Sequence, residues 1–193
     1  MKLFIKILGH SVTKMLDHCK LHTSSDNLED IYMELDECSK TEPTCMEAKQ
    51  ELEKTIRDYM SEYRLPDNPT IYDYLIMGLT SKDLIATFNW DPLLVQAYSR
   101  VMRYTTNLPQ LALLHGNVAV GYCIEDNVMG NVGMTCRYGK PLAPTKLLFP
   151  IKNKDYSSDT AISKSWRELN SALELAYMVT IFGYSAPKSG VAA

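Results

Sequence analysis

The sequence lacks several features that would place it in a specialised class of protein. No stretch approaches the roughly 20 apolar residues of a membrane span, and the segment 1–8 is too short and too charged for a signal peptide. Basic residues do not exceed acidic ones: 20 Lys and Arg stand against 23 Asp and Glu, so no excess positive charge is available to bind nucleic acid. We therefore expect a cytoplasmic protein that binds neither membranes nor nucleic acid.

Cysteines are few and follow no pairing pattern. They lie at positions 19, 38, 45, 123 and 136. An odd number without any CxxC motif indicates reduced thiols rather than a disulfide framework, and Cys123 and Cys136 alone do not supply the four ligands of a structural zinc site. His18 and His22 stand four residues apart around Cys19, but no third ligand is suggested nearby, so we interpret them as ordinary helical histidines. We expect no bound zinc.

What the chain does have is the composition of a globular protein. Its 193 residues are 46% hydrophobic, 22% charged and 9% aromatic. These values suit one ordinary hydrophobic core and exclude a disordered or fibrous chain. We expect a single domain over 1–193, with a helical part at 1–80 and a part that alternates strands and helices at 81–193.

The first 80 residues carry apolar side chains at helical spacing. The expected helices cover residues 3–19, a segment from Leu28 to Leu35, a segment from Ala48 to Met60, and 71–79. A strand over 2–8 that ends at Gly9 is the alternative for the first of them. Asp26 is a candidate cap for the second.

From Asp83 onward, apolar runs alternate with helical patterns. The expected strands cover residues 84–88, 111–114, 147–151 and 179–183. Continuous apolar runs such as 84–88 are typical of parallel strands covered on both faces. Asp91 and Asp159 are candidate caps of the two intervening helices, and 117–144 is predicted to be an irregular or hairpin insertion. The pattern predicts an α/β fold with a Rossmann-like, mainly parallel sheet and a helical N-terminal part.

Polar residues and glycines follow three of the expected strands. Thr87, Asn89 and Asp91 close the first, His115 and Gly116 the second, and Gly183, Tyr184 and Ser185 the last. Ligands of open α/β sheets bind outside the carboxyl ends of the strands, and amide, carboxylate, imidazole and hydroxyl groups beside glycine suit a sugar-phosphate ligand. Each residue also has a purely structural interpretation: Asp91 as a helix cap, Asn89 as a turn residue and Gly183 as a tight strand exit.

At these positions the chain resembles the sirtuin-like family of NAD-binding proteins, in particular its bacterial branch found in NAD-consuming defence proteins. Thr87-Phe88-Asn89-Trp90-Asp91 is similar to the family's Thr-x-Asn-x-Asp element, and Leu114-His115-Gly116 to its Leu-His-Gly. Phe182-Gly183-Tyr184-Ser185 is similar to its Gly-Tyr-Ser strand end. The resemblance covers residues 83–187 well and the first 80 residues weakly.

The resemblance implies NAD binding and hydrolysis to nicotinamide and ADP-ribose. Asn89 would hold the ribose or a water at its anomeric carbon, Asp91 would support that geometry, and His115 would act as general base. The residues implied to bind the cofactor are Thr87, Gly116, Gly183, Tyr184 and Ser185. Sirtuin deacylases add a zinc module with paired CxxC motifs, which this chain lacks, so NAD hydrolysis is the better analogy.

The chain also departs from the family. The glycine-rich loop that cradles the pyrophosphate is either reduced here to Gly9-His10-Ser11 or, if 2–19 is a helix, absent altogether. The chain also stops at Ala193, so we expect a domain truncated at both ends. A catalytically inactive nucleotide-sensing module or a protein-interaction module is therefore the alternative function. The partners expected are NAD or a related nucleotide, together with a protein partner or a second copy of the chain.

Overall fold

The computed structural model describes residues 9–19, 21, 27–149, 156–157 and 159–183. The chain forms two compact units, which are treated separately below. Unit 1 comprises 1–59, 149–154 and 185–193, and unit 2 comprises 60–148 and 155–184. The helical segment and the strand-bearing segment thus fall largely into different units, while the single domain expected over 1–193 stays a prediction.

Three helices make up the described part of unit 1: α2 (Gly9–His18), α3 (Leu28–Cys38) and most of α4 (Pro43–Ser61). The apolar series of α4 is buried as predicted, with Ala48, Leu52 and Ile56 each at most 1% exposed. The cap of α3 is Asn27, whose side-chain oxygen accepts a hydrogen bond from the Glu29 N–H at 3.1 Å. The predicted cap Asp26 and the alternative strand over 2–8 lie outside the described residues.

A disulfide joins α3 to α4, which corrects the prediction that all five cysteines are reduced. Cys38 and Cys45 are bonded, with their Cα atoms 5.8 Å apart. The short turn between the two helices brings the end of one beside the start of the other, a proximity that counting cysteines does not reveal. A second contact joins the same two helices: Tyr32 of α3 donates a hydrogen bond to Glu53 of α4 and stacks on Phe149 with ring centroids 4.8 Å apart.

Three helices belong to unit 2: α5 (Ile71–Met77), α6 (Leu93–Val101) and α7 (Thr160–Leu175). The start of α5 is fixed by Asp73, which accepts hydrogen bonds from the Thr70 N–H at 2.6 Å and the Thr70 hydroxyl at 2.7 Å. The same carboxylate accepts from the Arg100 Nε at 2.7 Å and thereby joins α5 to α6. Asp159 caps α7 as predicted by accepting from the Ile162 N–H at 3.0 Å.

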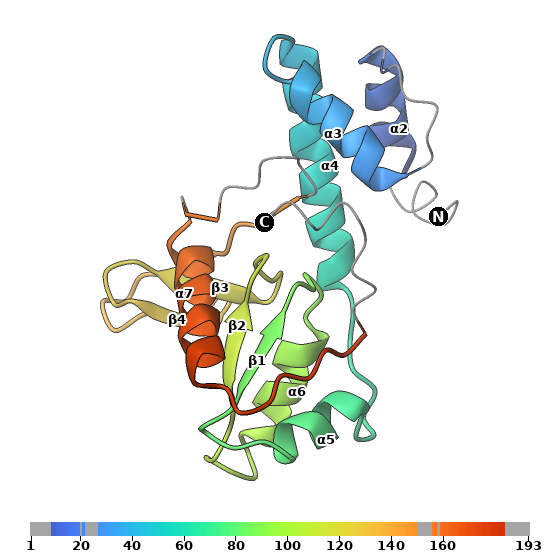
Figure 1. Ribbon diagram of the computed structural model, residues 1–193. Helices are drawn as coiled ribbons and strands as arrows, with labels where there is room; N and C mark the ends of the chain where they lie inside the picture. The colour runs from blue at the N-terminus through green and yellow to red at the C-terminus, as the bar shows by residue number, and fades with distance from the viewer. Residues whose placement is uncertain (1–8, 20, 22–26, 150–155, 158, 184–193) are drawn as a thin grey trace. The chain divides into compact units, whose positions relative to one another are not determined.

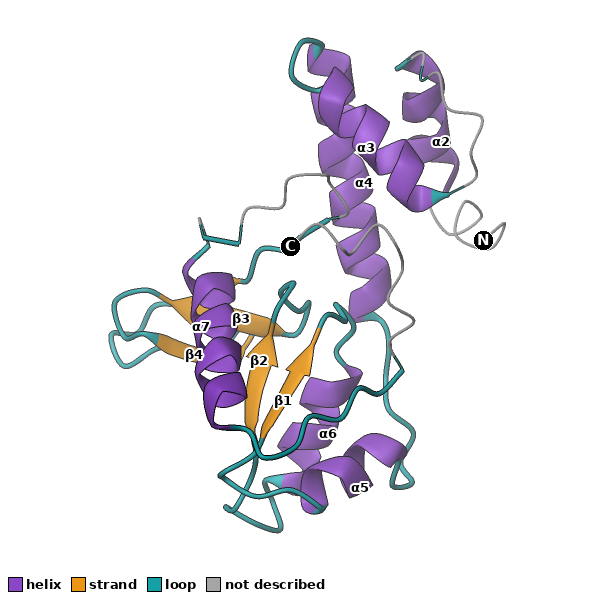
Figure 2. Ribbon diagram, viewed as in Figure 1, coloured by secondary structure: helices purple, strands orange, loops and turns teal. Residues whose placement is uncertain are grey.

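Two parallel strands, β1 (Leu84–Thr87) and β2 (Gln110–Leu113), form the first sheet, with Ile85 opposite Leu111 (Figures 1 and 2). Both of these residues pack against the apolar cluster of α5 and α6, while α7 runs alongside β2 (Figure 1). The strands therefore form where predicted. The expectation that the first is covered on both faces is wrong, because Ala86 is exposed and the other residues of β1 are only half-buried.

The outer edge of β2 is occupied by a helix rather than by another strand. The Leu113 N–H donates to the hydroxyl of Ser165 on α7 at 3.2 Å, and Ser165 is fully buried. The described residues of the two remaining predicted strands, 147–149 and 179–183, form no strand, and 150–151 lie outside the described residues. The predicted run at 179–183 is largely exposed, so its apolar pattern does not reflect burial in a sheet.

The second sheet is antiparallel and lies within the predicted insertion. Its strands are β3 (Val120–Cys123), β4 (Val128–Asn131) and β5 (Ala143–Pro144), in the order β4-β3-β5. Leu142 packs closely on it: a Cβ added at Gly121 would lie 2.8 Å from the Leu142 Cβ. The hairpin prediction is confirmed, but with three of the five described strands antiparallel, the fold is mixed α/β rather than a mainly parallel sheet.

None of the described helices combines the length and the hydrophobicity that crossing a bilayer requires.

Candidate functional site at the ends of the parallel strands

Five of the eight predicted site residues lie at the ends of β1 and β2 or in the loops that follow them. Thr87 is the last residue of β1, and Asn89 and Asp91 lie in the next loop; β2 ends at Leu113, and His115 and Gly116 lie in the loop after it. Because the strands are parallel and paired in register, both loops leave the sheet at the same end, the carboxyl end of the strands. The structure therefore brings these two groups of predicted residues together.

Asn117 ties the two loops to each other. Its side-chain amide nitrogen donates to the Asp91 carbonyl oxygen at 2.6 Å, and its side-chain oxygen accepts from the Ala119 N–H at 2.9 Å. The Val118 N–H adds a bond to the Trp90 carbonyl oxygen at 2.9 Å. With 1% exposure, Asn117 is a buried polar side chain whose hydrogen bonds fix the relative position of the loops. Sequence analysis did not assign it a role.

Thr87 and Asp91 use their side chains within their own loop. The Thr87 hydroxyl accepts from the Asn89 N–H at 3.1 Å, and one Asp91 carboxylate oxygen accepts from the Leu93 N–H at 3.0 Å at the start of α6. Burial, and secondarily the charge of Asp91, raise the pKa of the neighbouring Tyr72. Asp91 thus satisfies an N–H group at the start of α6 as a cap would, although Pro92 is the residue that directly precedes the helix. Asn89 is exposed at this end of the sheet.

The His115 ring belongs to a group of four rings, here called the aromatic cluster: Phe88, His115, Tyr156 and Trp166. Phe88 meets His115 edge-on at a centroid distance of 4.8 Å, and Tyr156 lies 6.2 Å from His115 with nearly parallel planes. Trp166 is anchored by its indole N–H, which donates to the Leu114 carbonyl oxygen at 3.0 Å. Phe88 is 38% exposed, so the cluster reaches solvent beside Asn89.

Gly116 is required by the packing of the backbone. Its φ of +79° lies in the left-handed region, and a Cβ placed on it would lie 1.9 Å from the Lys146 carbonyl oxygen. No side chain fits there without moving the main chain. The close contact at Gly116 is therefore with the protein's own backbone.

The third predicted group is not joined to the other two within the described residues. Gly183 is exposed, has a φ of +66°, and belongs to no strand, and a Cβ added to it would meet nothing within 4 Å. Tyr184 and Ser185 lie outside the described residues. The glycine tolerates its left-handed conformation, but the tight exit from a strand that was expected there is not formed.

A hollow of about 570 Å³ adjoins the same two loops on unit 2. Pro92 and Val118 line it, as do three arginines, Arg64, Arg100 and Arg103. Arg100 is committed to Asp73, and these hydrogen bonds hold the Asp73 pKa well below its usual range. The hollow is thus basic, but one of its guanidinium groups already has a carboxylate partner.

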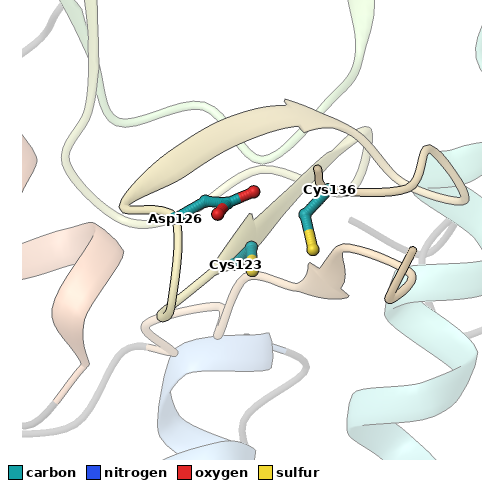
Figure 3. Close-up of side chains that lie close together, drawn as sticks. All are labelled: Cys123, Asp126 and Cys136. Atoms are coloured by element: carbon teal, nitrogen blue, oxygen red, sulfur yellow. The ribbon is translucent and has the colours of Figure 1, made fainter. Parts of the chain in front are cut away.

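A cluster of possible metal ligands lies at the antiparallel sheet. The Cys123 and Cys136 thiols and the Asp126 carboxylate all lie within 4.8 Å of one another (Figure 3). The expectation of no zinc rests on the number of cysteines alone and does not include the Asp126 carboxylate as a third possible ligand. The signal in the sequence is the spacing of Asp126 three residues after Cys123.

The histidine pair considered from the sequence gains no support as a site. The His18 ring lies 2.6 Å from the Lys14 carbonyl oxygen through Nδ1, and the Cys19 thiol donates to the Met15 carbonyl oxygen at 3.3 Å. Both contacts are of the kind that helical residues make with the preceding turn. His22 lies outside the described residues.

Comparison with known proteins provides no family assignment. No family model, curated protein or solved structure matches the chain.

Proposed function

We propose that unit 2 binds NAD or a related nucleotide at the carboxyl ends of β1 and β2 and hydrolyses NAD to nicotinamide and ADP-ribose. The observation that carries this proposal is the placement of Asn89, Asp91 and His115 on two loops at one end of a parallel strand pair. That end is where α/β proteins bind ligands. The sirtuin-like motifs at the same residues supply the substrate class.

In the proposed reaction, water attacks the anomeric carbon of the nicotinamide ribose. The glycosidic bond breaks and nicotinamide leaves with the bonding electron pair. His115 accepts the proton from the attacking water or a ribose hydroxyl, and Asn89 positions the water or the ribose. Asn117 acts indirectly by holding the Asp91 loop in place.

The aromatic cluster supports nucleotide binding. Phe88, the exposed member of the cluster, offers a ring surface beside Asn89, and stacking on such rings is a common way to hold a base or a nicotinamide. Within the described part of the chain, no glycine-rich loop offers backbone N–H groups to the pyrophosphate. Gly9 to Ser11 lie in helix α2 of unit 1 and form no phosphate loop. The Leu93 N–H at the start of α6 is taken by Asp91. We therefore expect NAD binding to be weak and hydrolysis by this chain to be slow.

The test measures NAD binding by calorimetry and nicotinamide release by chromatography. His115→Ala and Asn89→Ala should each lower nicotinamide release by more than tenfold, because a general-base step supplies roughly 10²–10⁴ in rate. His18→Ala and Asn170→Ala, which change exposed residues of the same types, should leave it unchanged. Turnover that survives His115→Ala would eliminate this mechanism, and absence of NAD binding to the wild-type chain would eliminate the function.

A second candidate function, a protein-interaction module, is favoured by the segment that follows α7. Its apolar side chains are exposed: Tyr177 at 104%, Met178 at 78%, Ile181 at 75% and Phe182 at 73%, and so is Leu175, the last residue of α7, at 87%. Exposed apolar side chains gathered in this way commonly mark an interaction surface. Sedimentation of the wild-type chain and of a Tyr177→Ser/Ile181→Ser variant would show self-association that the variant loses.

A cytoplasmic location and a role in bacterial defence complete the proposal. The first rests on the sequence composition and the second on the family resemblance alone. The Cys38–Cys45 disulfide argues against the cytoplasm, where such bonds are rare. Counting free thiols in protein taken directly from cells would decide between the two: five free thiols favour the cytoplasm and three favour an oxidising compartment.

A further inference from the structure

The cluster at the antiparallel sheet combines two kinds of metal ligand from two separate turns. Cys123 ends β3, Asp126 lies in the turn between β3 and β4, and Cys136 lies in a later turn closed by the Gly139 N–H to the Cys136 carbonyl oxygen at 2.9 Å. Figure 3 shows the two sulfur atoms and the carboxylate facing one another. The three ligand atoms are at most 4.8 Å apart.

This spacing is close to that of a tetrahedral zinc site. With Zn–S bonds of about 2.3 Å and Zn–O bonds of about 2.0 Å, ligand atoms in a tetrahedron lie roughly 3.3–3.8 Å apart. The atoms of the cluster therefore need to close by about 1–1.5 Å at most, which side-chain rotation can supply. Two thiolates and one carboxylate favour zinc over magnesium or calcium, which prefer oxygen ligands only.

The surroundings of the cluster also fit a metal centre. Cys123 and Cys136 are 4% and 8% exposed, and the Asp126 side chain is 3% exposed. Both Asp126 oxygens accept hydrogen bonds from Arg137, from its Nε at 2.7 Å and from its backbone N–H at 2.8 Å. Carboxylate ligands of metals are usually oriented by such outer partners. A carboxylate oxygen has a second lone pair, so these bonds leave Asp126 able to bind a metal.

Charge balance and a fourth ligand are available nearby. Two thiolates and a carboxylate around Zn²⁺ carry a net charge of about -1, which Arg137 beside Asp126 offsets. Glu125 lies beside Cys123, its Oε2 3.2 Å from the thiol sulfur, and its other oxygen is paired with Lys140 at 2.5 Å. Either Glu125 or a water can complete the tetrahedron.

We propose that Cys123, Asp126 and Cys136 bind one Zn²⁺ that holds the turns of the antiparallel sheet together. Binding releases the two thiol protons to solvent and involves no change of oxidation state. This proposal replaces the sequence-based expectation of no zinc and is independent of the proposed NAD site.

Two alternatives make different predictions for the same residues. In the first, the thiols are only part of the small apolar cluster that they form with Leu142. In the second, Cys123 and Cys136 form a disulfide with each other. Neither alternative binds zinc, so metal content distinguishes the proposal from both.

The test uses the full chain, reduced and stripped of metal, then titrated with Zn²⁺ and with Co²⁺ as a spectroscopic probe. We expect stoichiometric zinc by elemental analysis, and a Co²⁺ spectrum with thiolate charge-transfer bands and the intense visible bands of tetrahedral coordination. A Cys38→Ser/Cys45→Ser variant excludes the thiols that reduction releases from the disulfide, and Cys19→Ser controls for the remaining buried thiol. Both controls should bind zinc like the wild type.

Substitutions in the cluster should lower affinity in a defined order. Cys136→Ser should abolish stoichiometric binding, Asp126→Asn should weaken it by at least tenfold and alter the Co²⁺ bands, and Arg137→Ala should weaken it about 10–100-fold without changing them. Arg167→Ala, at another exposed arginine, is the matched control. Circular dichroism checks that each variant is folded. The proposal is overturned if the reduced wild-type chain binds no stoichiometric zinc, if Cys136→Ser binds it equally well, or if Asp126→Asn leaves affinity and spectrum unchanged.

Discussion

The two sheets of unit 2 are held together in different ways. The parallel pair β1–β2 packs on a conventional apolar cluster, in which Ile76, Leu94, Ala97 and Val101 of α5 and α6 are buried. The antiparallel sheet shares a second apolar cluster with the first sheet, in which Val120 of β3 packs with Val95 and Leu113. Its turns are held by a small cluster of Cys123, Cys136 and Leu142 and by the ion pairs Arg137–Asp126 and Lys140–Glu125. The parallel pair is thus stabilised mainly by helices, and the turns of the antiparallel sheet by a few side chains of their own.

The two proposed sites lie on different sheets, the nucleotide site on the parallel pair and the zinc site on the antiparallel sheet. The parallel pair, on which helices pack, presents polar loop residues at the carboxyl ends of its strands, and this arrangement suits ligand binding. The turns of the antiparallel sheet bury only the small cluster of Cys123, Cys136 and Leu142, and small β-structures of this kind often depend on a metal or a disulfide. Variants on each side should therefore have separable effects.

The largest loss of stability is expected from a substitution at the contact between α5 and α6, the helices that pack on the parallel pair. Asp73→Ala removes the cap of α5 and leaves Arg100 without its carboxylate, which should lower the free energy of unfolding by about 2–4 kcal/mol. Urea unfolding at pH 7 measures it, and Glu62→Ala, at an exposed residue, should change it by less than about 0.5 kcal/mol.

The same variant predicts a pH dependence. The hydrogen bonds from Arg100 and Thr70 lower the pKa of Asp73 in the folded protein, so its stabilising contribution is complete above the unfolded pKa of about 3.9 and is lost as pH falls toward the folded value. The difference between wild type and Asp73→Ala should be constant from pH 7 to 5 and shrink below about pH 4. A constant difference down to pH 2.5 would contradict this assignment.

A smaller and more local effect is expected in the antiparallel sheet. Leu142 is 4% exposed, and Leu142→Ala should cost about 2–3 kcal/mol, near the low end for a buried leucine. Amide exchange should accelerate in β3 and β4 and stay slow in β1 and β2. Val128→Ala, at a residue 46% exposed, is the control. Equal acceleration in both sheets would remove the distinction between them.

The smallest loss of stability is expected from a substitution at the outer edge of β2, which α7 covers. Ser165→Ala leaves the Leu113 N–H without its acceptor in a buried position, at a cost of about 1–2 kcal/mol. Ser171→Ala, on an exposed position of the same helix, should be neutral. If Ser165→Ala is equally neutral in thermal unfolding, the hydroxyl does not contribute to the edge.

Local patterns in the sequence predict the helices well. The i, i+4 series of Ala48, Leu52 and Ile56 and the cap Asp159 depend on neighbours along the chain, and the structure has α4 and α7 where these signals lie. The part of the candidate site that depends on the ends of strands can be predicted in the same way, since Asn89 and His115 each lie two residues after the end of a strand.

Long-range pairing could not be predicted in the same way. The run 179–183 has the composition of a buried strand, yet whether it pairs depends on a free strand edge elsewhere, and Ser165 occupies the edge of β2. The Cys38–Cys45 bond, the Asn117 link between loops and the proximity of Asp126 to two thiols likewise arise from folding in three dimensions. No periodicity encodes them.

The bond between Leu113 and Ser165 has a consequence during synthesis. The two residues are 52 positions apart, so a ribosome adding about 5–20 residues per second completes β2 roughly 3–10 s before the serine that covers its edge is made. During that interval the nascent chain exposes an unpaired strand edge to other chains. Slow translation between these positions would lengthen the exposure and favour aggregation, whereas chaperone binding to the nascent chain would shorten it.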